Sequence, residues 1–317
     1  MLSWGAFPIR LSLRHSRTLP WHGEGSLFSL FSWRGPGGTQ PRRRSSTYGF
    51  KLRHGPPDRQ DIPFLLGVNW REPHGERPVR FPFNLPWLND FGLAFNRPVT
   101  FFVGENGSGK STLLEALAFL TGLPITGGGY NEAATKLGPE TDNELGRSFR
   151  PAYRKKPNAG YFFRAELFAN FATLLDERDA DPDFRGNPYL RYGGKSLHQQ
   201  SHGESFLKLF THRLTRGLFL LDEPESALSP QRQLALLANI AKLVRQGQSQ
   251  FVIATHSPIL LTYPDAEILN FDEESLSPIT LEETSHFQIT RGILEHPDRY
   301  WQHLLDHPQQ ELFHDAK

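Results

Sequence analysis

Residues 104–112 read GENGSGKST, which matches the phosphate-binding pattern GxxxxGK[ST] at every fixed position. The apolar run Val99–Val103 before it predicts a buried strand, and Ser111–Leu120 after it, with leucines near helical spacing, predicts a helix. A glycine-rich loop between a strand and a helix can turn its N–H groups toward phosphate oxygens, and the helix N-terminus adds a positive dipole end. The stretch therefore predicts an α/β fold that binds the phosphates of a nucleotide.

The side chains of this loop have separate predicted roles. Lys110 should reach the β- and γ-phosphates, and Ser111 should place its hydroxyl on Mg²⁺. The residues expected to line the phosphates are Gly104, Glu105, Asn106, Gly107, Ser108, Gly109, Lys110, Ser111 and Thr112. The alternative is a chance glycine-rich turn, which the agreement of both flanking segments disfavours.

A second apolar strand is followed by two acids. Leu218–Leu221 leads directly into Asp222 and Glu223. Asp222 is expected at the carboxyl end of its strand, where α/β sheets bind ligands, and there it would hold Mg²⁺ through water. Glu223 would orient or deprotonate the water that attacks the γ-phosphate. A strand that merely ends in a charged turn would look the same in isolation, so this interpretation depends on the loop at 104–112.

Strands and helices alternate along the rest of the chain. The further predicted segments are strands at 161–164 and 251–254 and helices at 166–177, 203–215 and 231–245. On the last helix, Leu234, Leu237, Ile240, Ala241 and Val244 are expected to face inward. Alternation of this kind predicts a mainly parallel sheet covered by helices on both faces. The segment 122–158, rich in Gly, Pro and charge, is expected to be an irregular insertion.

Taken with SHGES at 201–205 and IATHSP at 253–258, these motifs resemble the ATPase head of ABC proteins. The nearest resemblance is to small soluble bacterial AAA-family ATPases, a group related to the RecF and DNA double-strand-break-repair ATPases, and it covers roughly residues 60–310. It implies an ABC-type P-loop NTPase domain over 58–317, with ATP and Mg²⁺ as cofactors. It also implies a homodimer that closes on ATP and acts as a conformational switch.

The resemblance assigns roles to residues outside the phosphate loop. In ABC proteins the signature of one subunit caps the ATP held by the other, so Ser201 and the Gly203 backbone would bind the γ-phosphate in trans. His202 and Glu204 depart from that signature, and an ordinary helix cap is the alternative. His256 matches the switch histidine that senses the γ-phosphate and the attacking water.

Three further positions have two interpretations or a looser match. The segment Ser226–Pro230 resembles the D-loop, which couples the two sites of a dimer. Glu166 stands near the place where ABC proteins have a glutamine that contacts Mg²⁺, and it either replaces that residue or is a plain surface carboxylate. Phe95 either stacks on adenine or packs in the core.

The charge of the chain is unevenly divided. Its 317 residues carry 35 Lys and Arg against 34 Asp and Glu, a net charge of +1. Residues 1–57 hold nine basic groups and one acid, a charge of +8, which leaves −7 for residues 58–317. The basic segment is interpreted as a disordered extension, with a transit peptide or a basic arm for nucleic acid or anionic lipid as alternatives.

The absence of cysteine excludes disulfides, thiolate zinc sites and a Cys nucleophile. It fits a reducing compartment, and the cytoplasm is the expected location. No apolar run approaches the roughly 18–20 residues of a membrane-spanning helix.

Two other functions compete with a stand-alone ATPase switch. One is the ATP-binding subunit of an ABC transporter, which shares both nucleotide motifs. The other is an ATPase of DNA repair or antiphage defence, for which DNA is a possible partner. A GTPase or small-molecule kinase fits less well, because no NKxD-type guanine-reading segment is present.

Overall fold

The computed structural model describes residues 62–71, 78–130, 143–190, 194–196, 202–226 and 228–306. The chain divides into two compact units, Tyr48–His296 and a second one formed by Met1–Thr47 with Pro297–Lys317. The described part of the second unit is the helix α9 (Pro297–Asp306). The basic segment 1–57 lies outside the described residues, so its interpretation stays a prediction.

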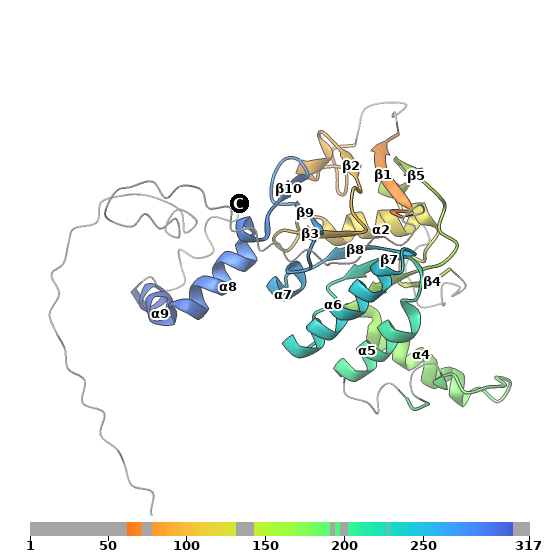
Figure 1. Ribbon diagram of the computed structural model, residues 1–317. Coiled ribbons are helices and arrows are strands. Elements are labelled where there is room, and N and C mark those ends of the chain that lie inside the picture. Colours follow the sequence, from red (N-terminus) through yellow and green to blue (C-terminus); the bar gives the residue numbers. More distant parts are fainter. Residues whose placement is uncertain are drawn as a thin grey trace, which may run out of the picture. The chain divides into compact units, whose positions relative to one another are not determined.

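The larger unit is built on a seven-stranded sheet with the order β10-β9-β3-β8-β7-β6-β4 (Figure 1). Its strands are β3 (Val99–Val103), β4 (Gly128–Gly129), β6 (Gly160–Arg164), β7 (Gly217–Asp222), β8 (Ser249–Ala254), β9 (Glu267–Asn270) and β10 (Ser277–Ile279). The five strands from β9 to β6 run parallel, and the two outer strands pair antiparallel. The predicted mainly parallel sheet is confirmed.

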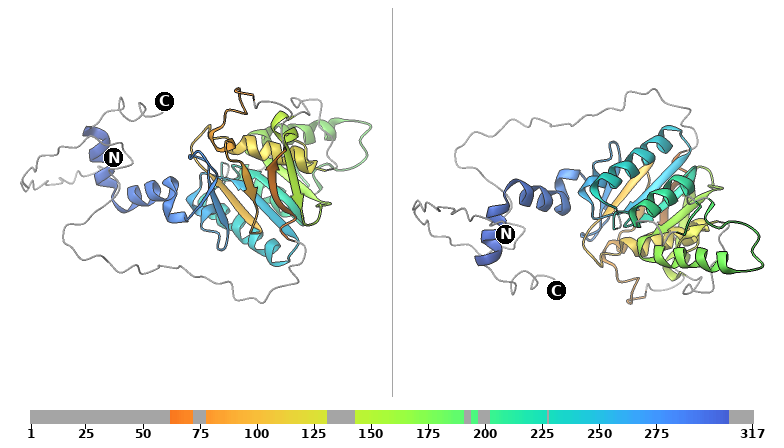
Figure 2. Two further views of the ribbon diagram at one scale, coloured as in Figure 1. Left: turned by 90° about the horizontal axis from the view of Figure 1, so that it is seen from above. Right: turned by 90° about the horizontal axis from the view of Figure 1, so that it is seen from below.

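Helices cover both faces of this sheet. They are α2 (Lys110–Thr121), α3 (Glu144–Arg147), α4 (Phe168–Ala180), α5 (His202–Arg213), α6 (Pro230–Arg245) and α7 (Pro258–Leu261), with short 3-10 turns η1 (Pro86–Leu88), η2 (Ala165–Leu167) and η5 (Leu281–Glu283). The helix α8 (Ser285–Glu295) follows η5 and extends away from the sheet in Figure 1. Successive strand residues alternate between the faces, so Phe101 packs with the α5 and α6 side chains while Phe102 packs with those of α2. The views in Figure 2 show the two faces in turn.

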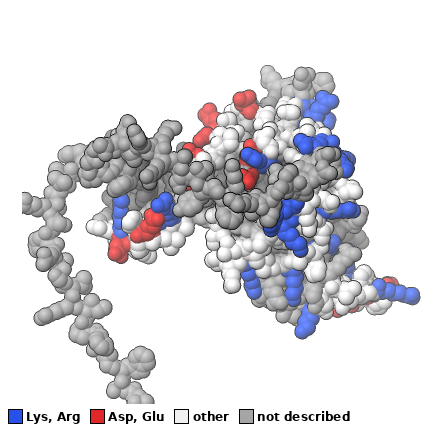
Figure 3. Space-filling view, viewed as in Figure 1, with Lys and Arg blue, Asp and Glu red and all other residues white. Residues whose placement is uncertain are grey.

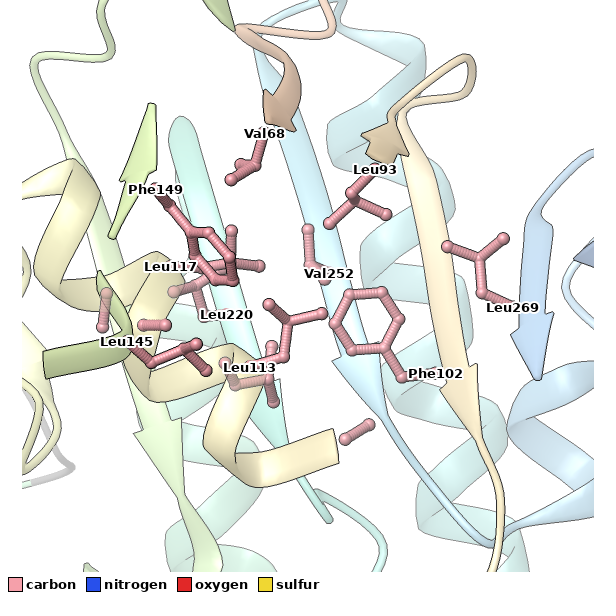
Figure 4. Close-up of a cluster of buried hydrophobic side chains, with 14 of the residues drawn as sticks. Val68, Leu93, Phe102, Leu113, Leu117, Leu145, Phe149, Leu220, Val252 and Leu269 are labelled. Carbon is pink, nitrogen blue, oxygen red and sulfur yellow. The ribbon is translucent and has the colours of Figure 1, made fainter. Parts of the chain in front are cut away.

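A second, three-stranded antiparallel sheet lies on the α2 face, with the order β2-β1-β5. Its strands are β1 (Leu65–Trp70), β2 (Gly92–Ala94) and β5 (Phe149–Tyr153). Figure 4 shows Val68, Leu93 and Phe149 from this sheet packed with α2 and the large sheet. The buried Gln250 side chain joins the two sheets, because its amide both accepts from Leu65 N and donates to Leu65 O at 2.9 Å.

Two expectations about local structure were wrong. The segment 122–158 is not irregular throughout, since it contains β4, α3 and β5, and the fully buried Phe149 explains why β5 is held in place. On α6, Ile240 is buried and Leu237, Ala241 and Val244 pack against the core as predicted, but Leu234 faces outward at 57% exposure, and Leu236 and Leu243 are buried. The inward face also includes the polar Gln233, whose amide donates to Leu228 O at 3.0 Å.

Candidate functional site

The phosphate loop joins β3 to α2 and has left-handed backbone at three glycines: φ is 150° at Gly104, 84° at Gly107 and 96° at Gly109. A Cβ added at Gly107 would meet no atom within 4 Å, whereas one at Gly109 would lie 3.0 Å from Leu85. The loop is therefore pressed against the core at its end and faces open space in its middle. Backbone of this kind is accessible to glycine at little cost, as the motif predicts.

Lys110 is folded back onto its own loop. Its side chain is buried, and Nζ donates to Gly104 O and Glu105 O, both at 2.8 Å. Burial lowers the pKa of Lys110, and the nearby carboxylates, with Asp272 first among them, oppose that shift. The ammonium group thus holds the loop in its curled form through two of the loop's own carbonyl oxygens.

Two side chains that the sequence did not point to hold the backbone of the loop. Trp87, in η1, is fully buried and donates from Nε1 to Ser108 O at 2.8 Å. Asp272, two residues after β9, accepts from Glu105 N at 2.6 Å. These partners lie 21 and 167 residues away along the chain, so no spacing rule within the motif could have found them.

Ser111 and Asp222 meet where the sequence predicted a metal site. Ser111 Oγ donates to Asp222 Oδ1 at 2.9 Å, and Asp222 is buried at the carboxyl end of β7. Burial raises the pKa of Asp222 to about 6, while the Ser111 hydrogen bond and Arg164 oppose the shift. A hydroxyl beside a carboxylate is an oxygen donor set that suits Mg²⁺. Among the described residues, no group of three or more His, Cys, Asp or Glu side chains could hold a metal ion.

Arg164 is a basic residue at this site that the sequence reasoning missed. It ends β6, directly beside Asp222 in the sheet register, and its Nε lies 3.9 Å from Asp222 Oδ2. The guanidinium also pairs with Glu115 at 2.7 Å and with Glu166. The Glu166 side chain is 66% exposed, which fits the surface-carboxylate alternative. The sequence did offer one signal for Arg164: it ends the predicted strand at 161–164, as Asp222 ends the apolar strand that carries the metal-site acid.

Glu223 and His256 come from neighbouring strand ends. Glu223 has φ of 47°, a left-handed conformation that is strained for a residue with a side chain, and strain of this kind is common at functional sites. Its carboxylate is about half exposed, and Oε1 lies 3.7 Å from His256 Nε2. The backbone N–H of His256 donates to Glu225 Oε1 at 2.7 Å, which fixes the turn after β8. The predicted acid and the predicted switch histidine are therefore brought together.

His256 has a second histidine beside it. His286, in the first turn of α8, places Nε2 2.8 Å from His256 Nδ1, and the two rings cross at 61°. Burial lowers the pKa of both histidines, and the positive charge of Lys110 adds to the effect. Nothing in the local sequence around His286 distinguished it.

The remaining predicted positions are less fully described. Ser201 lies outside the described residues, and Gly203 lies in the first turn of α5. Within the D-loop candidate, Ser229 is the N-cap residue of α6. Phe95 is buried in the core cluster beside Leu65 and Phe102, so the core-packing alternative holds for it.

Two family models match parts of the chain. One, described as "AAA domain", matches residues 83–161, and one described as "AAA domain, putative AbiEii toxin, Type IV TA system" matches residues 147–262. No curated protein matches the chain.

Solved structures of low identity are similar to the chain. They include cbiO1 from Clostridium perfringens, part of the ABC transporter complex cbiONQ (16% identity, TM-score 0.35, covering 68% of this chain and 91% of that one). A second is the ADP conformation of an ATP-binding cassette of an ABC transporter (15%, TM-score 0.37, 68% and 91%). A third is the SmcHead bound to the C-winged helix domain of ScpA (12%, TM-score 0.37, 70% and 99%). No helix in the described part of the chain has the length and hydropathy needed to cross a membrane.

Proposed function

We propose that this chain is an AAA-type P-loop protein with an ABC-type head, which binds ATP with Mg²⁺ and hydrolyses the bond to the γ-phosphate; the two family matches and the mainly parallel sheet support this. One observation carries the proposal: three neighbouring strand ends supply a complete set of groups for this reaction. The loop after β3 supplies Lys110, the end of β7 supplies Asp222 and Glu223, and the turn after β8 supplies His256.

The chain's own residues would bind and orient the nucleotide as follows. ATP phosphates offer Lys110 anionic oxygens in place of the carbonyls of Gly104 and Glu105, so the ammonium can turn to the β- and γ-phosphates without losing hydrogen bonds. The N–H groups of the loop and of the α2 N-terminus point to the same anion. Ser111 and Asp222 would hold Mg²⁺, which neutralises charge that develops on the phosphate oxygens.

In the proposed reaction, a water attacks the γ-phosphorus in line with the leaving oxygen, which departs with ADP. Glu223 orients this water and accepts its proton. His256, with Nε2 3.7 Å from the Glu223 carboxylate, would donate to the γ-phosphate or to the water. Inorganic phosphate and ADP are the products.

The proposal includes an ATP-dependent homodimer. Ser201 and the Gly203 backbone of one subunit would cap the ATP bound by the other, and the position of Gly203 in the first turn of α5 supports this, since helix N-termini bind anions. Closure on ATP and reopening after hydrolysis would make the chain a conformational switch. The proposal also includes a cytoplasmic location, which cell fractionation would test.

Two variants test the site and the dimer separately. Lys110→Ala should abolish nucleotide binding or turnover, whereas Lys242→Ala on the exposed side of α6 should not. Glu223→Gln should bind ATP without hydrolysing it and should elute as a dimer in ATP, whereas Glu274→Gln in the exposed turn after β9 should behave as wild type. Persistent turnover in Lys110→Ala would overturn the site assignment. A Glu223→Gln protein that stays monomeric and hydrolyses ATP normally would overturn the trans-site mechanism.

A role in DNA repair or defence is the second candidate, and a cluster of basic residues favours it over the transporter subunit. In the space-filling view of Figure 3, Lys and Arg side chains lie on the side of the molecule where Figure 1 draws β5. The exposed basic residues of α3, β5 and the following turn are Arg147, Arg150, Arg154, Lys155 and Lys156. Duplex DNA should stimulate ATP turnover at low salt and lose that effect at high salt.

A matched pair of variants tests this second candidate. Replacing Arg150, Lys155 and Lys156 by Gln should remove the stimulation by DNA, and replacing Lys208, Lys242 and Arg245 by Gln should not. Wild-type protein that neither binds duplex DNA at low salt nor responds to it would exclude the role. Copurification of a membrane permease with Glu223→Gln would favour the transporter subunit instead.

A further inference from the structure

The pair formed by His256 and His286 leaves one proton to be assigned. The two facing nitrogens, His256 Nδ1 and His286 Nε2, are 2.8 Å apart, so one must donate and the other must accept. Burial lowers the pKa of both rings and favours the neutral form of each. Each neutral ring carries a single N–H, and the direction of this hydrogen bond therefore fixes the tautomer of both histidines.

The surroundings of His256 decide the direction. If His256 Nδ1 donated, the lone pair of its Nε2 would face the Glu223 carboxylate at 3.7 Å, an arrangement of two electron-rich groups. If His286 donates, His256 carries its proton on Nε2, where the proton points toward Glu223. The second arrangement is electrostatically favoured.

The nitrogen of His256 that faces away from His286, Nε2, is free to bond to a ligand. In the described part of the chain, His256 Nε2 is buried and has no hydrogen-bond partner. A buried N–H without an acceptor is costly, so the site gains when an anionic oxygen arrives there. The charged groups that act on the two rings are Lys110, Glu105, Glu223 and Asp272, from the phosphate loop, the end of β7 and the turn after β9. The pair therefore lies beside the phosphate loop.

We infer that His286 is a positioning residue: its Nε2–H donates to His256 Nδ1 and holds His256 in the Nε2-protonated tautomer, which leaves that N–H available to donate to the γ-phosphate or to the attacking water. The inference rests on the proposed ATP hydrolysis and deepens it by naming the group that sets the switch histidine. The start of α8 is well anchored for this purpose. Its N-cap Thr284 is buried and accepts from Phe287 N at 3.3 Å.

Three substitutions at one position separate donation from packing. His286→Gln keeps a side-chain N–H at a similar reach, His286→Leu removes the donor, and His286→Glu offers only an acceptor. When a residue that hydrogen-bonds a metal-ligating histidine is mutated, metal affinity or activity typically falls about 10-fold to 100-fold, and we expect a loss of activity of the same order for the partner of His256. We expect His286→Leu to lower kcat about 10-fold or more, and His286→Gln to stay within about 3-fold of wild type, with ATP affinity changed less than about 3-fold in both. His296→Leu at the exposed C-terminus of α8 is the matched control.

The tautomer itself supplies a readout that does not depend on turnover. In nitrogen-15 NMR of histidine-labelled protein, with His256→Gln identifying the signal, wild-type His256 should carry its proton on Nε2. His286→Glu should move that proton to Nδ1. Circular dichroism and urea unfolding check that each variant is folded.

The outcomes separate this inference from the proposed function. If Lys110→Ala abolishes turnover but His286→Leu keeps wild-type kcat and the same His256 tautomer, His286 is not a positioning residue. The same conclusion follows if His286→Gln lowers kcat as much as His286→Leu does. If the wild-type protein does not hydrolyse ATP, the proposed function fails, and the NMR measurement still decides how the two histidines share their proton.

Discussion

Replacing Trp87 by Phe should remove a hydrogen bond that holds the backbone of the phosphate loop, without changing any residue proposed to contact the nucleotide. The indole Nε1 is the donor to Ser108 O, and its loss leaves that carbonyl unpaired beside the core, at a cost of about 1–3 kcal/mol. The ring also packs against Phe271 at a centroid distance of 5.4 Å, and phenyl leaves part of this space empty, at about 1–2 kcal/mol. The free energy of unfolding should therefore fall by about 2–5 kcal/mol.

Nucleotide affinity should fall as well, because the loop must then be ordered on binding. Ordering one freed residue costs about 1 kcal/mol, which corresponds to an affinity about 5-fold weaker. Urea unfolding with and without ATP measures the first effect, and calorimetric titration of ATP measures the second. Trp301→Phe is the control, since that side chain is 60% exposed. The reasoning is refuted if Trp87→Phe matches Trp301→Phe in both measurements.

Three other substitutions have outcomes set by the site. With chelator present and no nucleotide, Asp222→Asn should be more stable than wild type at pH 8 by about 3 kcal/mol at most. The reason is that burial raises the pKa of Asp222 in the folded state from 3.8 to about 6. The free energy of unfolding of the wild type therefore falls as the pH rises from 3.8 through 6, and urea unfolding at pH 4 should show no such difference between the two proteins. Arg164→Met should raise the pKa of Asp222 further, which urea unfolding as a function of pH, with chelator present, measures against Glu115→Gln as comparison. Gly109→Ala should lose nucleotide binding by about 10-fold or more because of its φ of 96° and the contact with Leu85, whereas Gly92→Ala, which meets nothing, should bind ATP normally.

The sheet and its nucleotide loop could be predicted because their signals are local. The segment Val99–Val103 is a strand with the predicted bounds, and the predicted helix at 111–120 is α2 with one residue more at each end. A buried parallel strand needs a continuous apolar run, and a phosphate loop needs glycines at fixed spacing. Asp222 and Glu223 followed from the same rule, since acids after an apolar strand emerge at the ligand-binding edge.

The supports of the site could not be predicted because they come from distant segments. Trp87, Asp272 and His286 each contact the site across the fold, and none stands at a fixed spacing from the motif it serves. β5 was missed for a related reason. Its sequence, FRPAY, contains a proline and an arginine, and only its pairing with β1 and the burial of Phe149 make it a strand.

The two groups closest to the proposed reaction are held as a unit by the ends of β7 and β8. The backbone N–H of Glu223 donates to Ala254 O at 3.0 Å, and the backbone N–H of His256 donates to Glu225 Oε1 at 2.7 Å, so the turn after β7 is bonded both to the end of β8 and to the turn that follows it. Such crossed bonds can stabilise the strained backbone of Glu223 before any nucleotide binds. The acid and the histidine then need no rearrangement relative to each other during the reaction. In the proposed function, the response to ATP would then come from groups outside this unit: the Lys110 ammonium within a subunit, and Ser201 with Gly203 from the other.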